Sequence, residues 1–362
     1  MAEYEYSFDV VLDNEQSTQI INLAPPNGTS YNASNDSTDA EAKREDTPGF
    51  YYYLLNFLAP GVFGVFTVIG IAGNGLVIYV IVSNPRMRSV TNLLLLNLAS
   101  ADVAFLFFCG PFTAYKYYAP QWAFGDIPCQ LLQYLLYVSA YVTIYTLVAI
   151  SLQRYLTIVW SHVSAAYRDA RNAVMFIVGL WLTVLLLNIP TLTAHQTKQM
   201  NDYSYCGIED RSIKPMFITF FVFGYAVPLS MTCVLYVLIV RYLRSQKLST
   251  LDQQHARERN TRTCRVIVLV VVVFGISWLP HHVNSLVAIY GQLPENEFYQ
   301  ILRVLWNCMM YSNSCVNPVI YNYMSEEFRT GFRMAVNCKR LPKANNQKRL
   351  QSTDPNNPID MV

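Results

Sequence analysis

Residues 266–282 read VIVLVVVVFGISWLPHH, and this stretch decides the fold class of the chain. It belongs to an apolar run over 264–290, which is long enough to cross the roughly 30 Å hydrocarbon core of a bilayer as a helix. Pro280 removes a backbone hydrogen bond and bends such a helix. Ionisable side chains such as His281 and His282 are costly inside a span unless they face a bundle interior or a wet cavity. The stretch therefore predicts a membrane helix that lines a solvent-reachable pocket above a hinge.

Apolar runs of this length recur along the 362 residues of the chain. Seven runs are expected, and they cover 58–82, 91–115, 130–157, 173–192, 216–241, 264–290 and 299–323. A composition with 53% hydrophobic and 14% charged residues is foreign to ordinary soluble domains. Because lipid cannot satisfy backbone polar groups, runs this long must be helices. We predict an all-α membrane protein with a seven-transmembrane-helix bundle over 54–323.

The basic loops predict the orientation in the membrane. Arg86 and Arg88 follow the first run, Arg168 and Arg171 follow the third, and 241–265 holds seven Arg or Lys residues. Loops rich in Arg and Lys stay in the cytoplasm. We therefore expect a multi-pass plasma-membrane protein with an extracellular N-terminus and a cytoplasmic C-terminus.

The N-terminal segment, 1–53, is expected to be an extracellular disordered tail. Its first 49 residues contain ten Asp or Glu against Lys43 and Arg44, and its start does not resemble a signal peptide. Three Asn-X-Ser/Thr sequons predict glycosylation, at Asn27, Asn32 and Asn35. The alternative is that the sequons arise by chance in an Asn- and Ser-rich tail.

Two of the eight cysteines lie on the predicted extracellular side. Cys129 begins the third run, and Cys206 lies between the fourth and fifth runs. Disulfides persist in that oxidising compartment. Although sequence alone does not prove connectivity, we predict a Cys129–Cys206 bridge that holds the loop over the bundle mouth.

Several short motifs occur in order along the seven runs. They are Gly73-Asn74, Leu98-Ala99-Ser100-Ala101-Asp102, Arg154-Tyr155, Trp181, Pro228 with Tyr236, Phe274 with Trp278-Leu279-Pro280, and Asn317-Pro318-Val319-Ile320-Tyr321. Together they resemble rhodopsin-like (class A) G-protein-coupled receptors over about 54–338. Tyr311 stands where opsins of that family carry the retinal lysine, so an opsin is disfavoured.

The resemblance implies an activation switch and an ion site. The implied switch residues are Arg154, Tyr155, Tyr236, Phe274, Trp278, Pro280, Asn317, Pro318 and Tyr321. The implied site for an allosteric sodium ion consists of Asp102, Ser139, Thr143, Asn313, Ser314 and Asn317. Hard cations prefer such oxygen ligands. The alternative is a protonated Asp102 in a structural hydrogen-bond network, and no other cofactor is expected.

The sequence departs from the family at the cytoplasmic end of the third run. Gln153 stands where the family usually has an acid before Arg154, and Asn260 stands where many members have a second acid. An amide offers no charge-assisted pair to the guanidinium. We hypothesise a weaker inactive-state clamp and higher basal signalling. The alternative is that helix packing compensates, because a partly exposed ion pair contributes only about 0–1 kcal/mol.

The expected ligand is a peptide rather than a small amine. Leu136 occupies the position of the ligand-pairing Asp of amine receptors, and the surrounding mouth is aromatic and neutral. Such a surface suits stacking and hydrogen bonding with an aromatic, amidated peptide. The candidate ligand-binding residues are Gln133, Leu136, Tyr137, His281, His282, Asn284, Tyr311, Tyr115, Trp122 and Tyr205.

Longer stretches resemble galanin and allatostatin-A receptors. They are MRSVTNLL (87–94), FCGPFTA (108–114), VVVVFGISWLPHH (270–282) and YSNSCVNP (311–318). The resemblance implies a neuropeptide ligand, with a C-terminally amidated peptide as one form of it, and a heterotrimeric G protein of the inhibitory class as partner. Another class A peptide receptor, of opioid or somatostatin type, is the nearest alternative.

The segment after the seventh run is amphipathic. Phe328, Phe332 and Val336 recur every four residues among basic residues, which predicts a juxtamembrane helix on anionic membrane lipids over 324–338. Cys338 is a candidate for palmitoylation, with a free thiol as the alternative. The segment 339–362 is expected to be a cytoplasmic disordered tail whose few hydroxyls give arrestin little to bind.

Other classes of function fit the sequence less well. A transporter or channel is expected to show repeated halves or charged midplane residues, and only Asp102 lies deep in a run as an acid. No catalytic constellation of an enzyme is visible, and nucleic acid is not an expected partner.

Overall fold

The computed structural model describes most of the chain between the two tails. The described residues are 53–84, 87, 89–119, 121–160, 169–200, 203–246, 250–291, 296–324 and 326–337. The candidate sites Asn27, Asn32, Asn35 and Cys338, and the tail 339–362, lie outside these residues.

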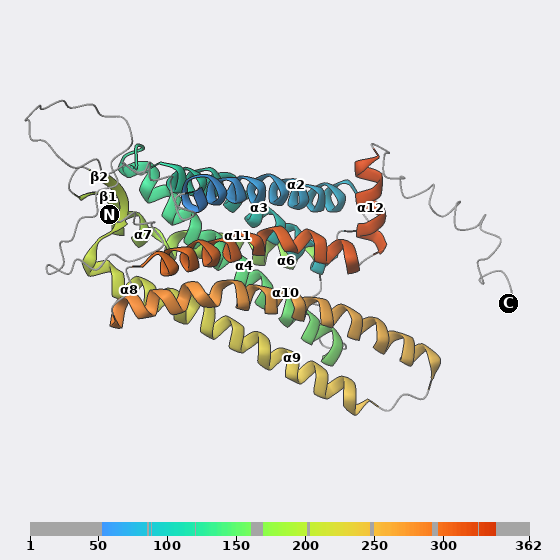
Figure 1. Ribbon diagram of the computed structural model, residues 1–362. Helices are drawn as coiled ribbons and strands as arrows, with labels where there is room; N and C mark the ends of the chain where they lie inside the picture. Colours follow the sequence, from blue (N-terminus) through green and yellow to red (C-terminus); the bar gives the residue numbers. More distant parts are fainter. Residues whose placement is uncertain are drawn as a thin grey trace, which may run out of the picture.

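Seven long helical segments run side by side, as Figure 1 shows. They are η1 with α2 (Leu54–Leu58, Ala59–Ser83), α3 (Val90–Tyr118), α4 (Asp126–Val159), α6 with α7 (Ala170–Leu187, Ile189–Ala194), α8 with η4 and α9 (Asp210–Phe221, Val222–Ala226, Val227–Ser245), α10 (Leu251–Tyr290) and α11 (Glu297–Met324). This arrangement confirms the predicted seven-helix bundle, and each segment contains one predicted apolar run.

Six of the seven segments are long and apolar enough to cross a membrane by composition alone. The seventh, α11, has 28 residues, a length of about 42 Å at 1.5 Å per residue. It is less apolar than the others because it contains the polar residues Asn313, Ser314 and Asn317, which are buried inside the bundle. A helix that faces neighbouring helices on several sides does not need a uniformly apolar surface.

The bundle buries a set of polar residues within its apolar core and exposes large apolar side chains on its outer face. Asn74, Asp102 and Asn317 are at most 2% exposed, whereas Val68 and Ile69 on α2 are more than half exposed. Large exposed apolar side chains are costly in water but match a hydrocarbon surround. The burial pattern therefore indicates a protein whose outer face meets lipid.

The fifth segment changes its winding in the middle. A π-helical turn, η4, separates α8 from α9, and Pro228 follows at the start of α9. The hydroxyl of Tyr225 in this turn donates a hydrogen bond of 2.8 Å to the carbonyl of Gly275 on α10. π-turns inside α-helices are frequent at functional sites. Here the turn connects the fifth segment to the helix that carries Trp278.

A β-hairpin that the sequence did not predict lies at one end of the bundle. Strands β1 (His195–Met200) and β2 (Tyr203–Ile208) pair antiparallel, with Thr197 opposite Cys206. The disulfide between Cys129 and Cys206 joins β2 to the start of α4, with 5.5 Å between the two Cα atoms. The predicted bridge is therefore confirmed, and it holds the hairpin against the bundle.

A short helix, α12 (Glu326–Val336), crosses the opposite end of the bundle (Figure 1). Phe328 is buried and its ring centroid lies 6.1 Å from that of Tyr321 on α11. Gly331 approaches Val80 so closely that a Cβ would lie 2.6 Å from a valine methyl group. The helix lies within the predicted amphipathic segment 324–338, and it packs its apolar face on α2 and α11.

Candidate functional site

The hairpin of β1 and β2, called the roof below, covers the end of the bundle that carries the candidate ligand residues, and hydrogen bonds hold it in place. The backbone N–H of Trp122 donates to Ser204 O at 2.8 Å, and the Ser204 hydroxyl donates back to Trp122 O at 2.9 Å. The backbone N–H of Thr197 donates to the Asp126 carboxylate at 2.7 Å. Together with the disulfide, these bonds fix both strands to the segment that leads into α4.

Two candidate ligand residues belong to an aromatic cluster under this roof. Ring centroids of Tyr115 and Phe124 lie 4.7 Å apart, and those of Trp122 and Phe124 lie 5.0 Å apart. Lys116 places its ammonium 5.9 Å from the centre of the Trp122 ring, within the range of a cation–π contact. The α3 side of the mouth is therefore aromatic and carries one positive charge.

Phe220 on α8 is the centre of a second aromatic cluster at the base of the mouth. Its ring centroid lies 4.8 Å from that of Tyr137, 4.9 Å from that of His282 and 5.8 Å from that of Trp278. His281 joins the same cluster, 5.5 Å from the His282 ring. Tyr137 therefore reaches the switch residue Trp278 through the Phe220 ring. His281 and His282 also lie beside Trp278 directly, at 6.1 and 6.2 Å between ring centroids.

The remaining candidates on α4 and β2 lie close to this base. Gln133 and Leu136 are buried on α4, one turn apart, and Tyr205 on β2 is partly buried. His195, at the start of β1, packs 6.3 Å from Tyr137 between ring centroids. Burial lowers the pKa of His195 to about 4, so the ring is neutral at neutral pH, and its Nδ1–H donates to Thr191 O at 2.9 Å.

Asn284 lies at the seam between α10 and α11. The hydroxyl of Tyr299 donates a hydrogen bond to the Asn284 side-chain oxygen, and the Arg303 guanidinium lies 5.9 Å from the Tyr299 ring centre. Arg303 is one turn before Asn307, whose amide donates to the Tyr117 hydroxyl on α3 at 2.9 Å. The side of α11 that carries Asn307 therefore faces α3, and Arg303 lies above Asn307 toward the mouth.

Tyr311 lies apart from the other candidate ligand residues. Its hydroxyl and that of Thr113 share a hydrogen bond of 2.6 Å, and its ring packs against Phe63 and Phe105 at 5.0 and 4.7 Å between centroids. It is 2% exposed. The structure therefore places Tyr311 in the seam of α2, α3 and α11, where it ties these helices together.

The six residues of the candidate ion site are all buried in the middle of the bundle. Asn317 Nδ2 donates to Asp102 Oδ2 at 2.8 Å, and Ser314 lies beside the same carboxylate. Asp102 Oδ1, Asn313 Oδ1 and Asn317 Oδ1 are buried and accept no hydrogen bond from a described residue. A cluster of buried oxygen acceptors with unused capacity fits the ligand preference of a hard cation.

The switch residues connect the mouth to the opposite end of the bundle. Trp278 stacks on Phe274 one turn below it, with 5.8 Å between centroids, and Pro280 lies inside α10 above both. Tyr321 is buried next to α12 at the far end, two residues after Val319 and three after Pro318. The ring packing thus extends from the Phe220 cluster through Trp278 to Phe274 on α10.

Arg154 lies at this far end beside Tyr236 and Cys264. Among the described residues, no carboxylate lies within 4 Å of its guanidinium, and its Nε is buried without a hydrogen-bond partner. The neighbouring Tyr155 accepts a hydrogen bond of 3.0 Å from Trp160 Nε1. The guanidinium is therefore held by packing rather than by an ion pair with a described residue.

Gln153 turns away from Arg154 and contacts α3. The Thr91 hydroxyl donates to Gln153 Oε1 at 3.1 Å, and Gln153 Nε2 donates to the Thr157 hydroxyl at 3.2 Å. Both polar ends of the amide are thus engaged with threonines, and the side chain serves the α3–α4 contact.

Comparison with known proteins identifies the family. The family model for the seven-transmembrane receptors of the rhodopsin family matches residues 73–321. The chain belongs to this receptor family. It is 35% identical over 288 residues to the allatostatin-A receptor of Bombyx mori, covering 78% of this chain and 80% of the relative. It is 37% identical over 302 residues to galanin receptor type 1 of Homo sapiens (81% and 86% covered), and 33% identical over 282 residues to galanin receptor 2a of Danio rerio (76% and 77% covered).

These matches confirm the predicted class A receptor with galanin-type and allatostatin-A-type relatives, and the receptor is not an enzyme. Sequence reasoning missed Phe220 and Phe124 as members of the mouth clusters of this receptor. Phe220 lies in an apolar run of similar residues, so nothing in the sequence separates it from a lipid-facing phenylalanine such as Phe223. It also missed Arg303, a cation in the less apolar seventh helix.

Proposed function

We propose that this receptor binds a neuropeptide of the galanin or allatostatin-A type and activates a heterotrimeric G protein of the inhibitory class. The observation that carries the proposal is the Phe220 cluster, which connects the mouth residues Tyr137 and His282 to Trp278 on α10. The relatives named above, which are galanin and allatostatin-A receptors, support the ligand class.

The chemistry of the mouth supports a peptide rather than an amine. The three acids of the hairpin and its flanks are engaged, because Asp126 accepts from Thr197, Asp210 pairs with Lys198 at 2.7 Å and Glu209 pairs with Arg211 at 2.9 Å. The candidate residues offer aromatic faces and amide groups instead. A peptide with aromatic side chains and an amidated end matches this surface through stacking and hydrogen bonds.

The mechanism follows from the packing of Phe220. A peptide group that enters between Tyr137 and His282 has to shift Phe220, which rests on Trp278. Packed side chains tend to have discrete arrangements, so a small displacement at the mouth becomes a larger movement of α10 at the Arg154 end. The ligand favours the moved state only to the extent that it binds that state more tightly.

The orientation in the membrane is part of the proposal. The hairpin end with the Cys129–Cys206 disulfide is extracellular, since disulfides persist there. The Arg154 end, with Arg241 and Arg244 at the end of α9, is cytoplasmic. In this orientation the sequons are available for glycosylation, and the cytoplasmic end meets the G protein, arrestin and the lipids beneath α12.

We further infer an allosteric sodium site at Asp102. Asp102 and the side-chain oxygens of Ser139, Thr143, Asn313 and Ser314 would hold the ion, with Asn317 beside them. A bound cation would stabilise the compact arrangement of α3, α4 and α11 around the carboxylate, and a movement of α11 would release it.

The test is guanine-nucleotide exchange on a purified inhibitory G protein by the full-length receptor in lipid nanodiscs. Galanin-like and amidated allatostatin-A-like peptides are added separately, and opioid- and somatostatin-like peptides serve as controls. We expect exchange to rise with one of the first two and not with the controls. No response to either, or conduction of ions by the receptor in liposomes, would contradict the proposal.

A further inference from the structure

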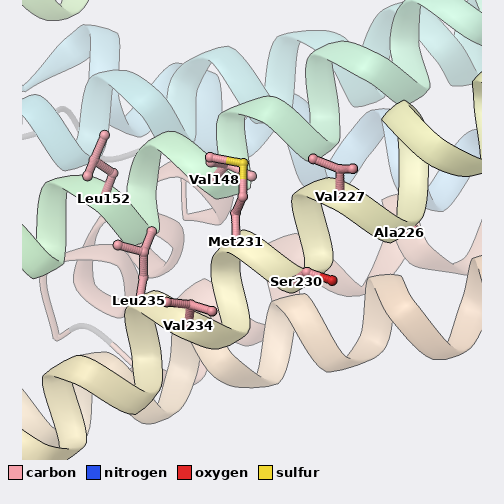
Figure 2. A pocket seen from close by; sticks show the side chains of 8 residues that line it. All are labelled: Val148, Leu152, Ala226, Val227, Ser230, Met231, Val234 and Leu235. Carbon is pink, nitrogen blue, oxygen red and sulfur yellow. The ribbon is translucent and has the colours of Figure 1, made fainter.

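A groove on the outer face of the bundle, at the seam of α4 and α9, is the feature that the peptide-receptor function leaves unexplained. It has a volume of about 550 Å³, within the usual range of small-molecule sites. Figure 2 shows its lining, which is apolar apart from the Ser230 hydroxyl: Val148 and Leu152 come from α4, and Met231, with its thioether sulfur, and Val234 come from α9.

The groove faces the hydrocarbon surround of the bundle. Val227, Met231 and Val234 on α9 and Leu152 on α4 are between 39% and 58% exposed, and both helices belong to candidate membrane spans. Whatever occupies the groove must therefore dissolve in the bilayer. The lining combines bulky side chains with two small ones, Ala226 and Ser230, four residues apart on the fifth segment. Small residues at this spacing also suit a second membrane helix, so the choice of a lipid rests on the positive charge beside the groove.

The face of α9 that lines the groove ends at a positively charged residue, Arg241. One face of α9 carries residues spaced at alternating intervals of four and three: Val227, Met231, Val234, Leu238 and Arg241. Arg241 is exposed at the end of this face. The groove and the guanidinium therefore open to the same strip of lipid.

The spacing along α9 matches the dimensions of one leaflet. Ser230 and Arg241 are eleven residues apart, a rise of about 16 Å at 1.5 Å per residue. Half of a roughly 30 Å hydrocarbon core is about 15 Å. When the groove lies at the depth of the acyl chains, Arg241 lies at the depth of the phosphates.

We propose that this groove binds an anionic phospholipid of the leaflet at the Arg154 end, with an acyl chain between α4 and α9 and the phosphate and anionic headgroup on Arg241. Anionic lipids are concentrated in the cytoplasmic leaflet and attract interfacial arginines, so the choice of lipid rests on the orientation proposed above. It does not depend on the identity of the peptide.

The place of the groove gives the lipid a means to affect signalling. Leu235 immediately precedes Tyr236, and Leu152 is two residues before Arg154. An acyl chain that contacts both α4 and α9 binds most tightly when the two helices are in one particular position relative to each other. The lipid thus favours that arrangement in proportion to its difference in affinity for the two states.

Native mass spectrometry of the full-length receptor measures the binding directly, with phosphatidylserine, phosphatidylcholine or cholesterol added to detergent micelles. Arg241→Gln removes the charge, and Met231→Trp fills the groove. Arg244→Gln makes the same charge change about 60° around the helix, and Val240→Trp adds the same bulk about 120° from Val234.

We expect the unmodified receptor to retain phosphatidylserine in preference to phosphatidylcholine. Arg241→Gln should reduce the retained phosphatidylserine about fivefold and leave phosphatidylcholine unchanged, while Met231→Trp should remove both. The Arg244→Gln and Val240→Trp controls should bind as the unmodified receptor does.

The proposal is overturned if the two control variants lose as much retained phosphatidylserine as Arg241→Gln and Met231→Trp do. It is also overturned if the receptor retains cholesterol alone, or if it forms dimers through this face in place of binding lipid. Peptide-driven nucleotide exchange in pure phosphatidylcholine nanodiscs is run in parallel. Intact exchange in a receptor without lipid selectivity means that the lipid site fails while the peptide-receptor function stands.

Discussion

The two ends of the bundle hold their functional residues in different ways. At the hairpin end, a disulfide, a strand pair and two aromatic clusters fix the candidate ligand residues. At the other end, Arg154 has no described carboxylate within 4 Å, and Gln153 bonds to Thr91 and Thr157 instead. The hairpin end is therefore cross-linked, whereas the Arg154 guanidinium is held without an ion pair to a described residue, and we expect the Arg154 end to be the more weakly restrained of the two. Four changes test this contrast.

The largest effect is expected from loss of the disulfide. Cys129 and Cys206 are 77 residues apart, and closing a loop of that length stabilises a fold by about 4 kcal/mol in the chain-entropy model. The paired Cys129→Ser and Cys206→Ser variant should unfold at a clearly lower temperature and lose peptide binding. Cys233→Ser, an exposed free thiol on α9, is the control. A double variant as stable as this control would show that the roof does not depend on the bridge.

The next largest effect should come from Phe220→Ala. Truncation of a buried phenylalanine costs about 3–5 kcal/mol through lost contacts and the cavity left behind, and here it also removes the ring that lies between Tyr137 and Trp278. The temperature of thermal unfolding and the potency of the peptide should both fall. Phe223→Ala, one turn away and 52% exposed, should change neither by much. Similar behaviour of the two variants would remove Phe220 from the coupling pathway.

A moderate effect is expected from Asp102→Asn. Replacing sodium by choline at constant ionic strength should raise ligand-free nucleotide exchange in the native receptor, because the ion holds the compact state. The variant lacks the carboxylate charge that attracts the ion, so its exchange should be insensitive to sodium. A sodium response that survives the substitution would favour the purely structural hydrogen-bond network.

The smallest effect is expected from Gln153→Asp at the weakly restrained end. A partly exposed ion pair with Arg154 would contribute about 0–1 kcal/mol, which lowers ligand-free exchange by up to about fivefold. Thr157→Val, which removes one partner of Gln153 without adding a charge, is the control. Equal basal exchange in the native and Gln153→Asp receptors would mean that helix packing alone sets the off state.

The sequence predicts the fold and the disulfide because both depend on features that can be read along the chain. The lengths of the apolar runs determine where the spans lie, and Cys129 and Cys206 are the two cysteines on the predicted extracellular side. The amphipathic spacing of Phe328 and Phe332 likewise predicts α12.

The hairpin and the mouth clusters depend on partners distant in sequence. The segment 195–208 has no clean apolar alternation, and its paired strands are anchored by hydrogen bonds to Trp122 and to Asp126 at the start of α4. Phe220 acquires its role only because the π-turn η4 and its neighbours direct that part of the fifth segment toward α10. The aromatic surface predicted for the mouth includes Tyr311, whereas the structure encloses its ring between Phe63 and Phe105.

Phe220 is expected to transmit peptide binding from the mouth to α10. This transmission is tested most directly by the distance between spin labels at Gln254→Cys on α10 and Tyr323→Cys at the end of α11, in a Cys233→Ser background. At saturating peptide we expect this distance to increase in the Phe220-intact receptor and in Phe223→Ala, and to stay at its peptide-free value in Phe220→Ala. A full increase in Phe220→Ala would contradict the account.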